Sequence, residues 1–75
     1  MKAYRIRWRD AKTSHGWREK DDINLEPFVC ETLGFLVQQD KRNITVAASY
    51  CKANETYAEI VTIPVECIIS KKVVR

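Results

Sequence analysis

Three side chains of the types used in nucleophilic catalysis lie close together in the sequence of this 75-residue chain. Ser14 could serve as the nucleophile, His15 as the general base and Asp10 as the group that orients the base. A triad needs these groups to converge in space, which neighbours within one loop rarely do. The adjacent carboxylates Asp21 and Asp22 are typical of solvated charges or of a helix start, not of an acid–base pair. We therefore expect a protein that is not an enzyme.

The residue types that bind metals and cofactors are too few and too widely spaced to predict such a site. His15 is the only histidine, and no CxxC spacing occurs. The two glycines, Gly16 and Gly34, cannot form a glycine-rich phosphate loop. The sequence thus predicts no metal and no cofactor. The thiols lie among strand-forming residues, which indicates buried, reduced cysteines: Cys30, Cys51 and Cys67.

Positive charge is concentrated at one end of the sequence. Residues 1–20 hold seven basic and two acidic residues, a net charge of +5, whereas six basic and eight acidic residues give the remainder −2. Arg5, Arg7 and Arg9 alternate with apolar residues and should share one face of a strand, with Lys12 and Arg18 following. Guanidinium groups contact phosphates well, so these five residues are the candidate nucleic-acid-binding set. A solvated basic edge and a surface for an acidic protein partner are the alternatives.

Three further residues are candidates for contact with a protein partner. Trp17 and His15 lie in a polar segment, where Trp17 either packs against the edge of the domain or contacts a partner. Phe35 belongs to a strand with two apolar faces, more hydrophobic surface than a small monomer easily covers. The alternative for Phe35 is a place in the core.

The elements that must position these residues are mostly strands. Asp21 and Asp22 could begin a short helical turn, and Pro64–Cys67 suits a 3₁₀-like turn. Gly34 interrupts the second strand and indicates a bend there. Alternation and turn residues predict five strands, over Tyr4–Trp8, Phe28–Gln39, Ile44–Tyr50, Tyr57–Ile63 and Ile68–Val74. We expect one mainly-β domain over residues 1–75, a small five-stranded barrel with at most one short helical turn.

Composition sets the remaining expectations. No apolar run approaches the length of a membrane span, and the first residues lack the apolar region of a signal peptide. We therefore expect a cytoplasmic protein that does not contact a membrane. A chain of this size buries only about 60–65% of its unfolded surface, so association would add needed stability.

The central strands resemble those of Sm-like and Src-homology-3-like barrels over Phe28–Val74. Gly34-Phe35-Leu36 followed by Asp40 is similar to the first Sm motif, and Ile63 with Ile68 is similar to the hydrophobic frame of the second. Ile44 stands where that family has asparagine, and the arginine–glycine pair is absent. The resemblance implies the barrel topology and edge-strand pairing, but not the family's RNA pocket.

A second resemblance, to short uncharacterised bacteriophage and prophage proteins, covers nearly the whole chain. It rests on Trp8-Arg9-Asp10-Ala11, Ser14-His15-Gly16-Trp17, Thr32–Val37 and Ile63-Pro64, with Leu33 replacing the usual valine. It implies an accessory protein in the cytoplasm of a bacterial host. We expect a binding protein that acts through protein–protein interaction or self-association, as a homo-oligomer or with a host or phage protein; nucleic-acid binding through the arginine face is the alternative.

Overall fold

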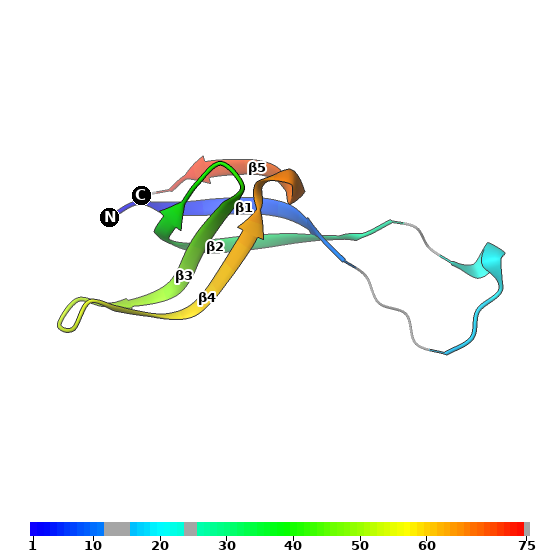
Figure 1. Cartoon of the computed structure of the whole chain (residues 1–75), viewed down its shortest axis with the longest axis horizontal. Coiled ribbons are helices and arrows are strands. Elements are labelled where there is room, and N and C mark those ends of the chain that lie inside the picture. The colour runs from blue at the N-terminus through cyan, green and yellow to red at the C-terminus, as the bar shows by residue number, and fades with distance from the viewer. Residues whose placement is uncertain (12–15, 24–25, 75) are drawn as a thin grey trace.

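Five strands form a single antiparallel sheet in the structure, a computed structural model that describes residues 1–11, 16–23 and 26–74 (Figure 1). The order across the sheet is β4-β3-β2-β1-β5. The mainly-β prediction is confirmed, and each predicted strand is present. The strands are β1 (Ala3–Asp10), β2 (Phe28–Gln39), β3 (Asn43–Cys51), β4 (Thr56–Pro64) and β5 (Ile68–Val73).

Two three-residue 3₁₀ turns lie between the strands, one more than the single short helical turn predicted; the first ends at Asp22, whereas Asp21 and Asp22 were expected to begin it. The turn η1 (Lys20–Asp22) lies in the long β1–β2 connection, and η2 (Val65–Cys67) joins β4 to β5. Pro64 precedes η2 in an extended conformation and cannot donate a backbone hydrogen bond. The chain therefore leaves β4 here and crosses to pair with β1 through β5.

The sheet bends at Gly34, where the backbones of β2 and β3 approach closely. The first half of β2 pairs with β1 up to Phe35, and its second half pairs with β3 from Phe35 onward. A Cβ atom at Gly34 would lie 2.9 Å from the Ala47 carbonyl oxygen and 3.1 Å from the Val46 Cβ. Only glycine fits this crossing without displacement, which agrees with the bend predicted from the sequence.

The bend creates the core by bringing together strands that are not neighbours. Tyr4 and Ile6 of β1 are buried in one cluster with Ile44 and Val46 of β3 and Ile63 of β4. The Trp8 indole packs at its margin and donates a 2.9 Å hydrogen bond to the Thr32 hydroxyl. The sheet thus curls around a small apolar centre.

The curled sheet is open among the described residues. Strands β4 and β5 are its two edges, and β5 pairs only with β1. The β3–β4 hairpin and the β1–β2 connection project in opposite directions (Figure 1). The radius of gyration is 15.6 Å, well above the ~11 Å of a compact chain of this length. The molecule is accordingly elongated, with a longest extent of 53 Å.

We expect Gly34→Ala to destabilise the fold by about 1–3 kcal/mol, because the added methyl group overpacks the crossing of β2 and β3. Chemical denaturation measures this loss. Ser49→Ala, on an exposed position of β3, is the control and should change the free energy of unfolding by less than about 0.5 kcal/mol. Equal stability of the two variants would contradict the close approach.

The β2–β3 turn is held by the Asp40 carboxylate. The backbone N–H groups of Arg42 and Asn43 each donate a 2.8 Å hydrogen bond to its Oδ1 atom. These bonds, to Arg42 first and then Asn43, hold the pKa of Asp40 below its ordinary value. Its ionised form therefore stabilises the folded state at pH values above the unfolded pKa of about 3.9, and this stabilisation is lost as pH falls through the folded pKa.

Asp40→Asn should make the protein less stable at neutral pH, because the amide oxygen accepts the same bonds without a charge. The difference in unfolding free energy between wild type and variant should shrink as pH falls below about 4. Urea denaturation over a pH series measures it. A difference that stays constant with pH would exclude a titrating Asp40.

Candidate binding surface

The face of the sheet that points away from the core carries most of the candidate residues; we call it the outer face. Its composition follows from strand alternation, because side chains next to a buried residue point to the opposite side. In register across four strands lie Ala3, Phe35, Ala47 and Ile60. Of its members, Ala3 and Ala47 are buried, Phe35 is half-buried and Ile60 is exposed.

Exposed apolar side chains lie at one end of the row and beside it. Leu33 is 63% exposed, Ile60 56% and Val74 47%. A shallow groove of about 300 Å³ runs beside them, lined by Ala3, Leu33, Gly34, Phe35, Ala48 and Val74. The predicted partner residue Phe35 lines this groove and is half-buried. It therefore presents part of its ring to the surface and part to the sheet.

The arginine face predicted from alternation is present on β1. Arg5, Arg7 and Arg9 are all exposed on the outer face, beside the apolar row. Arg5 forms an exposed ion pair with Glu31 of β2, with 3.4 Å between Nε and Oε1. Among the described residues, Arg7 and Arg9 form no ion pair, so two of the three guanidinium groups are available to an anion.

Sequence reasoning missed one cation of this surface. Lys72 of β5 lies directly beside Arg5 and is exposed. The two residues are 67 positions apart, so only the pairing of β1 with β5 brings them together. The one signal in the sequence was the alternation of β5 itself, which places Lys72 on one face and Lys71 on the other.

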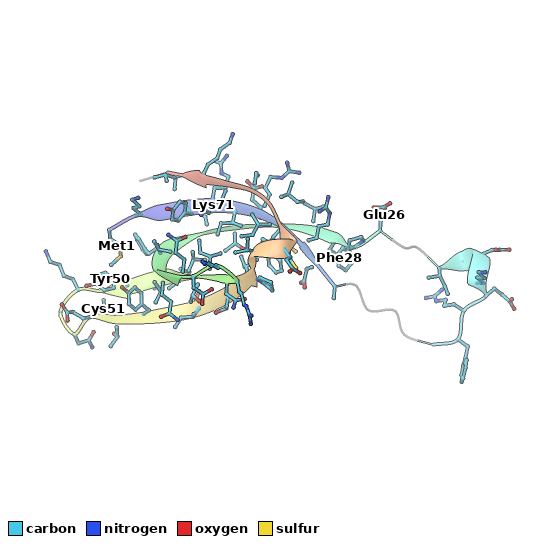
Figure 2. The ribbon with its side chains drawn as sticks, turned by 45° about the horizontal axis from the view of Figure 1, so that its top comes forward. Met1, Glu26, Phe28, Tyr50, Cys51 and Lys71 are labelled. Carbon is cyan, nitrogen blue, oxygen red and sulfur yellow. The ribbon has the colours of Figure 1, made fainter. Side chains whose placement is uncertain are left out.

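Lys71 belongs to the opposite side of the sheet. Its ammonium group lies 5.1 Å from the centre of the Tyr4 ring and 3.5 Å from the Gln39 side-chain oxygen. Figure 2 shows it on β5, away from the hairpin end that carries Tyr50 and Cys51. Lys71 therefore covers the core and does not extend the basic surface.

Trp17 and Arg18 lie in the β1–β2 connection, outside the sheet, and both are exposed. The Trp17 side chain is fully exposed, so the interpretation of Trp17 as a packing anchor is wrong. Trp8, with Leu36, Cys67 and Ile68, already fills the margin of the core, and residues 16–23 lie beyond it (Figure 1). The other two candidates of this segment, Lys12 and His15, lie outside the described residues.

Other reactive groups do not assemble into a site in the part of the chain that the structure describes. No three His, Cys, Asp or Glu side chains there cluster as metal ligands. Asp10 uses its carboxylate to accept the backbone N–H of Ala11 at 2.8 Å, while Ser14 and His15 fall outside the described residues. Cys51 is exposed at the end of β3, contrary to the prediction of buried thiols, because the hairpin projects from the core.

Comparisons with known proteins add no assignment: no protein-family model, curated protein or solved structure matches the chain. Within the described residues there is no helix with the length and apolar character needed to cross a membrane. The candidate surface therefore has to be interpreted from its own geometry.

The two tryptophans offer a direct check of this surface. In Trp8→Phe, the remaining Trp17 should emit at the wavelength of free tryptophan and be fully quenched by iodide, because its side chain is fully exposed. In Trp17→Phe, the remaining Trp8 should emit at shorter wavelength and resist quenching, because it is half-buried and bonded to Thr32. A shielded Trp17 in the monomer would reinstate it as a packing anchor.

Proposed function

We propose that this chain is a non-enzymatic binding protein that self-associates, or binds a protein partner, through the apolar half of its outer face. The observation that carries the proposal is the exposure of the apolar side chains Leu33, Ile60 and Val74 around the half-buried Phe35. Contiguous apolar surface of this kind is typical of protein–protein contacts. Proteins cover such a sheet face by packing a second layer about 10 Å away.

The small core gives a second reason to expect association. Its five buried members, Tyr4, Ile6, Ile44, Val46 and Ile63, are few for a chain that must offset its own ordering entropy. Burial of Leu33 and Ile60 against another molecule would add about 1.5–3 kcal/mol for each fully covered side chain. Association would therefore increase the stability of the fold and also remove the exposed apolar side chains from water.

The curled sheet also supports an Sm-like or Src-homology-3-like barrel as the fold type. The order β4-β3-β2-β1-β5 and the contact of β1 with β3 and β4 side chains across the core are what such a barrel needs. Closure would require the edges β4 and β5 to pair. In an oligomer the same edges could pair with a neighbouring copy, which is a second route to assembly.

We further propose the cytoplasm of a bacterial host as the place of action and a bacteriophage or prophage as the origin. The support is the resemblance carried by Trp8–Ala11, Ser14–Trp17 and Thr32–Val37. The transcript should accordingly rise when a prophage that carries the gene is induced. Constant transcript through induction would argue against this origin.

Nucleic-acid binding is the second candidate function, and a specific observation favours it. Arg5, Arg7, Arg9 and Lys72 stand exposed together, and a single described carboxylate, that of Glu31, pairs with them. Clustered cations on one face are the electrostatic footprint of a polyanion site. This basic area adjoins the apolar surface and meets it at Leu33, but Arg7 and Ile60 each belong to one area alone, so variants at these two residues test the two functions separately.

Self-association predicts an oligomer in sedimentation equilibrium at micromolar concentration. Ile60→Lys should weaken assembly by at least about tenfold, because it places a charge in the apolar row. The position is exposed on an edge strand, where lysine is well tolerated, so the monomer should stay folded. Val65→Lys, at another exposed apolar position, on η2, is the control and should leave assembly unchanged. A monomeric wild type would refute self-association and leave a different protein as the partner of this face.

A further inference from the structure

We propose that the outer face of β1 and β2 is a track for single-stranded nucleic acid, in which Arg5, Arg7 and Arg9 contact successive phosphates and unpaired bases lie over Leu33 and Val29. The inference rests on the second candidate function above and names its ligand. It follows from the spacing of the cations, from the apolar side chains beside them, and from the position of one carboxylate.

The three arginines follow one another at every second residue of β1. Alternate residues of a β-strand lie roughly 6.5–7 Å apart on the same face, so Arg5, Arg7 and Arg9 follow one another along β1 at about this backbone spacing. This interval is close to the separation of neighbouring phosphates in an extended nucleic-acid strand. Each guanidinium can form two hydrogen bonds with one phosphate, so three arginines match three successive phosphates. Lys72 adds a fourth cation beside Arg5.

The neighbouring strand supplies the surface that distinguishes a single strand from a duplex. Leu33 is the cross-strand partner of Arg5, and Val29 is the partner of Arg9. Both apolar side chains are more than half exposed, at 63% and 55%. A duplex keeps its bases stacked inside, so it would leave these two apolar side chains in water. A single strand with its phosphates on β1 can turn its bases onto β2 and cover them.

The charge of Glu31 lowers the affinity of the track for nucleic acid. It is the cross-strand partner of Arg7 and forms its ion pair with Arg5, so its carboxylate lies within the basic surface. Both side chains of the pair are more than half exposed, which makes the pair weak and easily replaced by a phosphate. The carboxylate then remains beside the bound phosphates and repels them. Removing its charge should therefore strengthen binding, which a purely structural role would not predict.

The test uses fluorescence anisotropy with a labelled oligothymidine and a duplex of equal length, over a salt series. The wild type should prefer the single strand, with a slope of log K against log salt of about −2 for three phosphates. Arg7→Gln should weaken binding by at least about fivefold and reduce the slope by about 0.7. Glu31→Gln should strengthen binding by a similar factor, and Leu33→Ser should weaken it without changing the slope.

Lys52→Gln is the matched control, because it removes one exposed positive charge at the tip of the β3–β4 hairpin, away from the track. It should alter affinity by less than about twofold. All changed residues are exposed, and unchanged thermal unfolding verifies that each variant is folded.

The outcomes distinguish nucleic-acid binding in general from the specific track for a single strand. Absence of binding to either oligonucleotide at low salt removes nucleic-acid binding altogether. Equal affinity for single strand and duplex would overturn the track, as would equal losses of affinity in Arg7→Gln and Lys52→Gln. Either result would leave only a nonspecific electrostatic attraction for nucleic acid. Displacement of the oligonucleotide by polyglutamate at equal charge concentration, with no effect of Leu33→Ser, also overturns the track and indicates an acidic protein partner.

Discussion

The close approach of two backbones at Gly34 is the constraint on which the rest of this fold depends. A side chain there would meet the Ala47 carbonyl oxygen at 2.9 Å, so β2 and β3 could not cross as they do. The crossing lets β2 change partners halfway along its length, from β1 to β3. Because of this change, Tyr4 and Ile6 reach Ile44, Val46 and Ile63 across the curl. A flat sheet of the same five strands would have no enclosed apolar centre.

The same bend determines what the outside of the sheet can do. Curling directs one side chain of each alternating pair to the core and its neighbour to the outer face, where Arg5, Leu33 and Ile60 are exposed. The strand pairing then places apolar and basic side chains on different parts of that face. Apolar residues of β2, β3 and β4 line up as one row, while β1 and β5 contribute Arg5, Arg7, Arg9 and Lys72. Two surfaces of different chemistry thus lie side by side on one thin sheet.

Sequence patterns predicted the parts of this architecture that depend on local alternation. The five strands, the bend at Gly34 and the arginine face follow from period-two patterns and from turn residues, and all are present. Features that depend on long-range pairing could not be predicted. Lys72 joins the arginines only through the β1–β5 register, and Trp17 is exposed because the small core is already filled by Trp8 and its neighbours. Closure of a barrel is a property of the edges, on which alternation carries no information.

The two candidate functions meet at Leu33, which lines the apolar groove and also lies across from Arg5. A molecule stacked on the apolar row covers Leu33, and a base lying over Leu33 blocks the same side chain from a protein contact. Stacking two outer faces also brings two sets of arginines towards each other in a partly dry interface, where like charges repel more strongly than in water. Polyanion binding would neutralise that repulsion while occupying Leu33. If both proposals hold, the two uses of this face are interdependent: a ligand on β1 would change the free energy of assembly on β2 to β4, and by linkage assembly would change the affinity for the ligand equally.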